Sequence, residues 1–132
     1  MYVIIMGGGR LGLKVALDLI ADDKDVTIIE KDENRCKFLA TQLDTMVMCG
    51  SGTDIETLIN ADINDADVFV AATGNDEINL LSSLMAWRFK PEKIIARVNE
   101  TQHGKVFTDN NLINVIVPET VEAGYLENCF KT

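Results

Sequence analysis

A glycine-rich turn near the amino terminus carries the clearest chemical signal in the sequence. Gly7-Gly8-Gly9-Arg10-Leu11-Gly12 has the spacing G-x-G-x-x-G and follows the apolar run Tyr2–Met6. In this pattern the first glycine permits a tight turn, the second lets the backbone approach a pyrophosphate, and the third lets a helix pack closely on the strand. Free N–H groups and the positive dipole end at the start of that helix favour phosphate. Arg10 can add a cationic contact.

An acidic residue follows at the spacing expected of a ribose-binding carboxylate. Glu30 ends the second apolar run and lies 23 positions after Gly7 (30 minus 7), close to the ~20 typical of dinucleotide-binding folds. Its carboxylate can accept hydrogen bonds from both ribose hydroxyls and would repel a 2′-phosphate, which favours NAD over NADP. ATP and ADP also carry free hydroxyls and stay open as ligands. Lys31 and Arg35 are interpreted as a solvated helix start.

Small and polar residues follow three later apolar runs, where strands are predicted to end. Cys49-Gly50-Ser51-Gly52-Thr53-Asp54 can approach an adenine ring, although its last two residues can equally serve only as helix caps. Ala71-Ala72-Thr73-Gly74 forms a second small-residue turn opposite the glycine turn, and its last two residues can contact ribose or pyrophosphate. Arg97 and Val98 end the fifth run. Arg97 can bind a phosphate or pair with a carboxylate such as Glu100.

The sequence lacks the groups that would perform catalysis beside a nicotinamide. A dehydrogenase needs a His, Lys or Tyr that moves a proton. The only histidine, His103, lies where a surface helix is predicted to begin, and neither Tyr2 nor Tyr125 has a lysine four residues later. We find no P-loop, nucleophile elbow or metal-ligand cluster. These absences favour a binding protein over an enzyme.

The framework that must position these residues is an alternation of apolar runs and helical segments. The runs predicted to be strands are Tyr2–Met6, Val26–Ile29, Met46–Cys49, Val68–Ala72, Ile94–Val98 and Val115–Val117. Helices are predicted at Leu11–Ile20, Glu33–Gln42, Asp54–Ile59, Asp76–Phe89 and from Pro118 to about residue 131. This order predicts an α/β, Rossmann-like, doubly wound sheet of six parallel strands, order 3-2-1-4-5-6, with helices on both faces.

Length and charge restrict the class of protein further. A chain of 132 residues with 47% hydrophobic residues has room for one domain, residues 1–132. Its net charge of −9 would repel nucleic acid and anionic lipid, so we expect no nucleic-acid partner. No apolar run approaches the ~20 residues of a membrane helix, so we expect no membrane insertion. The three separated cysteines fit reduced thiols in a cytosolic protein, each in the core.

The residues quoted above make the chain resemble the N-terminal nucleotide-binding domain of TrkA-type potassium-uptake regulators, also called the RCK or KTN domain. The resemblance spans nearly all of the chain. It rests on the glycine turn with its strand, on Glu30, and on the segments Gly50–Thr53, Ala71–Asn79, Ile94–Val98 and Val117–Glu119. The last three segments separate this family from other Rossmann domains.

The resemblance implies a non-catalytic, cytoplasmic regulatory subunit that binds NAD or NADH, or ATP or ADP, and controls a membrane potassium transporter or channel from the inner face of the membrane. By position, the ligand contacts would be residues 7–11, Glu30, Thr73, Gly74, Arg97 and Val98. Relatives often have Asp-Ala in place of Ser51-Gly52, and they commonly continue into a smaller C-terminal domain.

The same resemblance implies homodimers or higher rings in which the terminal helix, about residues 118–131, crosses to a neighbour. From the residues alone, that helix either packs on its own sheet or docks on a second subunit. Two other functions stay open at this point. One is the cofactor domain of an NAD-dependent oxidoreductase without its substrate domain, and the other is a soluble sensor of the NADH/NAD ratio.

Overall fold

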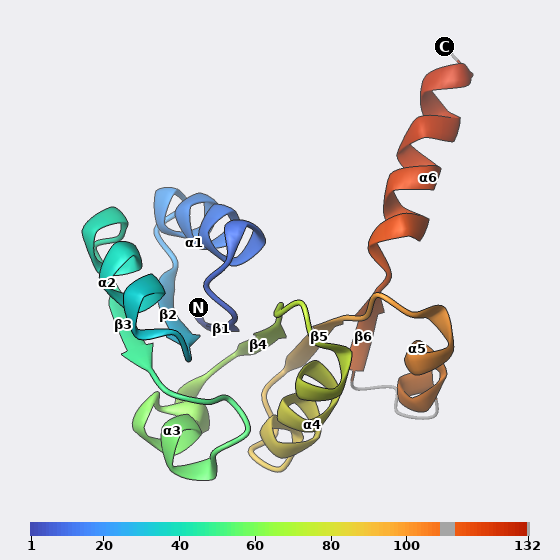
Figure 1. Cartoon of the computed structure of the whole chain (residues 1–132). Helices are drawn as coiled ribbons and strands as arrows, with labels where there is room; N and C mark the ends of the chain where they lie inside the picture. The colour runs from blue at the N-terminus through green and yellow to red at the C-terminus, as the bar shows by residue number, and fades with distance from the viewer. Residues whose placement is uncertain (109–112, 132) are drawn as a thin grey trace.

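Six parallel strands form one sheet in the order β3-β2-β1-β4-β5-β6 in the computed structural model of this chain (Figure 1). The structure describes residues 1–108 and 113–131. The strands are β1 (Tyr2–Met6), β2 (Asp25–Glu30), β3 (Met46–Cys49), β4 (Val68–Ala71), β5 (Lys93–Arg97) and β6 (Ile113–Ile116). The predicted order is confirmed. Strand β6 lies earlier than the predicted run because Ile113 is buried and pairs with Ile94.

The direction in which strands are added to the sheet reverses at β1. This strand pairs with β2 on one side and with β4 on the other, so that Met6 lies beside both Ile29 and Ala71. The carboxyl ends of the three strands are therefore level, and the loops that leave them meet at one edge. A crevice at this reversal is the usual ligand site of doubly wound sheets.

Helices cover both faces of the sheet (Figure 1). Packed on one face are α1 (Arg10–Ala21) and α2 (Glu33–Gln42), and on the other α3 (Ile55–Asn60) and α4 (Asp76–Trp87). A 3-10 turn (Ile63–Asp65) precedes β4, α5 (Thr101–Thr108) precedes β6, and α6 (Pro118–Phe130) follows it. None of the helices in the described residues is long and apolar enough to cross a membrane.

The core consists of two apolar layers, one on each face of the sheet. Neighbouring residues of β1 point in opposite directions, and both Ile4 and Ile5 are fully buried. Ile4 packs with Leu58 and Phe69 in the layer under α3 and α4, whereas Ile5 packs with Leu39 in the layer under α1 and α2. Burial on both faces explains why the strands read as continuous apolar runs.

Two features of the surface bear on the predictions. None of the residues of α6 is buried, and the helix extends away from the sheet (Figure 1). The prediction of three core cysteines is wrong for two of them: Cys36 is buried, but Cys49 and Cys129 are exposed. The physical reason is position, because Cys49 ends the outer strand β3 and Cys129 lies on α6.

Candidate functional site

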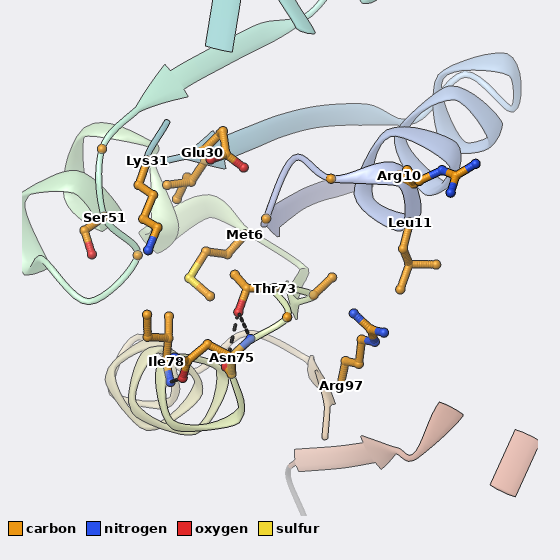
Figure 2. A pocket seen from close by; sticks show the side chains of 17 residues that line it. Met6, Arg10, Leu11, Glu30, Lys31, Ser51, Thr73, Asn75, Ile78 and Arg97 are labelled. Atoms are coloured by element: carbon orange, nitrogen blue, oxygen red, sulfur yellow. Dashed lines mark hydrogen bonds between the residues drawn. The ribbon is translucent and has the colours of Figure 1, made fainter. Parts of the chain in front are cut away.

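A cleft of about 650 Å³ opens at the carboxyl ends of β1, β2, β4 and β5 (Figure 2). Among the predicted site residues, those that line it are Gly7, Gly9, Arg10, Leu11, Glu30, Ser51, Thr73, Gly74 and Arg97. Gly50, Gly52 and Ala72 also line it, and they belong to the two small-residue segments that were predicted to border the ligand. The sequence prediction did not include the other lining residues, which are Met6, Ile29, Lys31, Asn75 and Ile78. Gly8, Gly12 and Val98 lie outside the lining, and Val98 is fully buried.

The glycine turn follows β1 tightly and leaves one glycine open. Gly7 has a φ of +110°, and a Cβ there would come within 2.9 Å of the backbone of Ala72 and Thr73. A Cβ on Gly12 would collide with the carbonyl oxygen of Gly7, so this glycine allows α1 to pack against the turn. A Cβ on Gly9 would meet nothing within 4 Å, because this residue faces the cleft. The open space at Gly9 is a cradle that a side chain would fill.

Helix α1 starts without a capping side chain. Gly9 is its N-cap, and its first turn contains no acidic residue. The helices that follow β2, β3 and β4 each begin with an Asp or Asn that accepts a backbone N–H, namely Asp32, Asp54 and Asn75. The first N–H groups of α1 are thus available to an anion in the cleft.

Glu30 is held in place by two backbone N–H groups. Its Oε1 accepts a hydrogen bond from the Gly8 N–H at 2.8 Å, and its Oε2 accepts one from the Asp32 N–H at 2.8 Å. Each carboxylate oxygen retains a lone pair for another donor. Gly8 does not line the cleft, but its N–H holds Glu30. A side chain at Gly8 would collide with Leu39, so this position favours glycine. The carboxylate is therefore fixed at the edge of the cleft and still able to accept hydroxyl groups.

Arg35 has a structural role that sequence reasoning missed. The sequence predicts a solvated helix start at this position, but Nε of Arg35 donates a hydrogen bond of 2.6 Å to the carbonyl oxygen of Gly8. Its guanidinium also lies 4.7 Å from the ring centre of Phe38. Arg35 thus ties α2 to the glycine turn, a contact between segments 27 residues apart that local sequence cannot indicate.

A buried amide joins the two elements on the other side of the cleft. Asn79 of α4 is fully buried, and its Oδ1 accepts hydrogen bonds from the backbone N–H (3.1 Å) and hydroxyl (2.6 Å) of Thr73. Its Nδ2 donates to the carbonyl oxygens of Thr73 at 2.9 Å and Arg97 at 2.7 Å. A polar residue on the buried side of a helix is a signal that it has hydrogen-bond partners in the fold, but the sequence does not indicate which residues they are.

Arg97 directs a cationic side chain into the cleft without a partner. Its guanidinium points toward Leu11 at the start of α1, while the guanidinium of Arg10 points outward (Figure 2). Nε of Arg97 is buried and makes no hydrogen bond, and the described residues provide it with no ion pair, Glu100 included. A buried unpaired donor on a cation is costly unless an anion completes it. The cleft is thus suited to an anionic group at this end.

The charge of the cleft is opposite to that of the whole chain. Arg10, Lys31 and Arg97 line it, and Glu30 is its only acidic lining residue among those described. The chain as a whole carries a net charge of −9. Concentrating basic residues at one concave site of an acidic protein favours a ligand with negative charge.

Asp76 links the start of α4 to the segment that follows β5. Its carboxylate accepts hydrogen bonds from the N–H groups of Asn99 (2.8 Å) and Glu100 (2.9 Å) and lies 2.8 Å from Nδ1 of His103. Burial alone would raise the pKa of Asp76, but these hydrogen bonds and the histidine lower it. His103 is exposed and does not line the cleft, so the structure gives it a role in this link.

Comparison with known proteins places the chain in a family. A family model described as the TrkA-N domain matches residues 3–118. The chain belongs to the TrkA-N family. A Trk system potassium uptake protein TrkA homolog of Methanothermobacter thermautotrophicus is 54% identical over 127 residues, which cover 96% of this chain and 59% of that protein. The homolog of Pyrococcus abyssi is 35% identical, with 96% and 58% covered. This TrkA-N chain thus spans about three-fifths of these relatives.

Solved structures with little sequence identity have the same TrkA-N fold. The TrkA-N domain of the Escherichia coli inner membrane protein ybaL superposes with a TM-score of 0.88 at 20% identity, covering 97% of this chain and 95% of that one. An AMP-bound Kef C-terminal domain of Shewanella denitrificans gives 0.80 at 24% identity, covering 96% and 77%. The GsuK channel bound to NAD gives 0.76 at 23% identity, covering 89% and 21%.

Proposed function

We propose that this TrkA-N chain, residues 1–132, is a non-catalytic regulatory domain that binds NAD(H) or an adenine nucleotide in the cleft and controls a membrane potassium transporter or channel. The observation that carries the proposal is that hydrogen-bond acceptors lie at one end of the cleft and hydrogen-bond donors at the other. Glu30 presents acceptors at one end, whereas the uncapped start of α1 and the unpaired Arg97 present donors at the other. A nucleotide has hydroxyl donors and phosphate acceptors in this order.

The cleft residues assign a role to each part of such a ligand. Glu30 would accept the ribose hydroxyls, and its negative charge would disfavour a 2′-phosphate. The N–H groups that follow Gly9 would bind the phosphates, and Arg97 would neutralise them from the opposite side. Met6, Ile29 and Ile78 provide apolar surface for a flat ring.

The relatives support the proposed partner. The curated relatives are potassium uptake proteins of the Trk system, and the GsuK structures belong to a channel and to its RCK domain. We therefore propose a cytoplasmic location, peripheral to the inner face of the membrane through the transporter. NAD, AMP and ADP are bound by structural neighbours. They support a nucleotide ligand and leave the choice among adenine nucleotides to measurement.

We further propose that the domain assembles with copies of itself through α6. Tyr125 is 71% exposed and Phe130 87%, which is high for aromatic side chains, and none of the residues of α6 is buried. A nucleotide can regulate a partner only if it binds one arrangement of such an assembly better than the other. The ligand would therefore act by favouring one arrangement of the subunits.

Calorimetric titration tests this proposal directly. The purified protein is titrated with NADH, NAD, NADPH, ATP and ADP, and the series is repeated with Glu30→Ala and with Asp18→Ala, a control at an exposed carboxylate on the surface of α1. We expect ligands without a 2′-phosphate to bind, the Glu30 variant to bind them about tenfold or more weakly, and the control to match the wild type.

Binding by none of the ligands would overturn the nucleotide proposal. Sustained oxidation of NADH with carbonyl compounds would favour the oxidoreductase reading instead. Nucleotide binding without copurification of a potassium transporter, in cells that express both, would favour the soluble sensor.

A further inference from the structure

We propose that Asn79 is a positioning residue for the phosphate end of the cleft, holding the turn at Thr73 and the strand end at Arg97 in one fixed arrangement. The inference rests on the proposed nucleotide function and names a residue outside the cleft lining. Asn79 touches no ligand in this scheme. It acts through the two elements that its amide joins.

The geometry of the amide supports a positioning role because both of its ends are fully used. Oδ1 accepts two hydrogen bonds and Nδ2 donates two, so that every hydrogen-bonding direction of the side chain is defined. Three of these four bonds fix the Thr73 backbone and hydroxyl, and the fourth fixes the Arg97 carbonyl oxygen. Thr73 lies six residues before Asn79 in the sequence, and Arg97 lies 18 residues after it.

The position of Arg97 gives this link its consequence for binding. Asn79 holds the carbonyl oxygen of Arg97, and the side chain of the same residue lines the cleft with its guanidinium pointing toward Leu11 (Figure 2). Within residues 1–108 and 113–131, Nε of this guanidinium makes no hydrogen bond that would orient it. The backbone of Arg97 is therefore the part of this residue that the protein fixes, and Asn79 is one of the groups that fix it. Small displacements at such a support weaken charged hydrogen bonds to a ligand.

Two substitutions separate the two ends of the amide. Asn79→Leu keeps the approximate volume and removes all four hydrogen bonds. Asn79→Asp keeps an acceptor for the Thr73 N–H and hydroxyl but places an oxygen against the carbonyl oxygens of Thr73 and Arg97. Ser83→Ala is the matched control, because Ser83 is a fully buried polar residue of the same helix whose Oγ has no hydrogen-bond partner in the part of the chain that the structure describes.

The readout is the affinity for ADP compared with that for adenosine, measured by NMR titration of each protein, with thermal unfolding followed in parallel. We expect both Asn79 variants to bind ADP about tenfold or more weakly and adenosine within about twofold of the wild type, because only ADP reaches the Arg97 end. Ser83→Ala should match the wild type for both ligands. A role in folding alone would lower the melting temperature while leaving the affinities of the folded protein unchanged.

Several outcomes would overturn the inference. The inference is wrong if folded Asn79→Leu binds ADP with wild-type affinity. It is also wrong if this variant loses affinity for adenosine and ADP equally. If neither variant folds, the side-chain amide signals of Asn79 in the wild type decide: they should shift with ADP and not with adenosine, and an equal or absent response refutes the role. A wild type that binds neither of these ligands, nor NAD, NADH or ATP, refutes the proposed function itself, which is a distinct result.

Discussion

Gly9→Ala is the sharpest test of the phosphate site because it separates binding from stability. A methyl group at this position meets no protein atom within 4 Å, and the backbone of Gly9 (φ −73°, ψ −163°) is open to alanine. Alanine is a poorer N-cap than glycine but restricts the unfolded chain more, and each effect is about 1 kcal/mol or less with opposite sign. We therefore expect the melting temperature to change by no more than about 4 °C.

Binding should respond very differently. The methyl group would stand in the cradle in front of the first N–H groups of α1 and keep a phosphate away from them. Losing one hydrogen bond to a charged oxygen costs about 1.5–3 kcal/mol, which corresponds to about a 10- to 150-fold rise in Kd. Calorimetry with NAD and ADP measures this change, and circular dichroism measures the melting temperature.

A second glycine provides the control for this experiment. A Cβ on Gly124 of α6 would also meet nothing within 4 Å, and this residue lies far along the chain from the cleft lining. Gly124→Ala should stabilise the helix by up to about 1 kcal/mol and, at protein concentrations where the domain is monomeric, leave the nucleotide Kd unchanged. Unchanged affinity in Gly9→Ala would refute the argument that phosphate lies against the start of α1.

Three further substitutions test other parts of the structure. Gly12→Ala should destabilise the fold strongly, seen as a lower melting temperature, because the new Cβ collides with the Gly7 carbonyl oxygen; a wild-type melting temperature would contradict this packing. Arg97→Met should raise the melting temperature of the free protein slightly, since it removes a buried unpaired donor, yet weaken ADP by about tenfold or more; intact ADP affinity would exclude a phosphate contact. Because the pKa of Asp76 is lowered by its partners, its stabilising contribution is present above the ordinary value of 3.8 and is lost as the pH falls through the lower folded value. Asp76→Asn should therefore be less stable than the wild type at neutral pH, with the difference shrinking below pH 3.8 in urea unfolding curves; a constant difference would rule out this linkage.

The fold and the cleft could be predicted from local patterns, whereas the supporting contacts could not. The alternation of apolar runs with helical segments indicated the strand order, and the spacing from Gly7 to Glu30 indicated where two strand ends would meet. Both signals arise within short stretches of chain. The roles of Arg35 and Asn79 depend instead on contacts between segments that only the folded chain brings together. The exposure of Cys49 follows from its place at the end of the edge strand β3; the predicted strand order already implied this position, whereas the residue type alone indicated the core.

The hydrogen bonds around Glu30 imply that the two ends of the cleft lose different amounts of side-chain entropy when a ligand binds. The carboxylate is already immobile, so recognition at that end costs almost no side-chain entropy when the ligand arrives. The Arg97 side chain must still be ordered, at about 0.5–1.5 kcal/mol for a side chain with many rotamers. Arg97 lies at the end of β5. Asn99 and Glu100, which follow it closely, donate hydrogen bonds to Asp76 and connect this strand to α5. We therefore expect most of the side-chain entropy that is lost on binding to come from Arg97 at the end of β5.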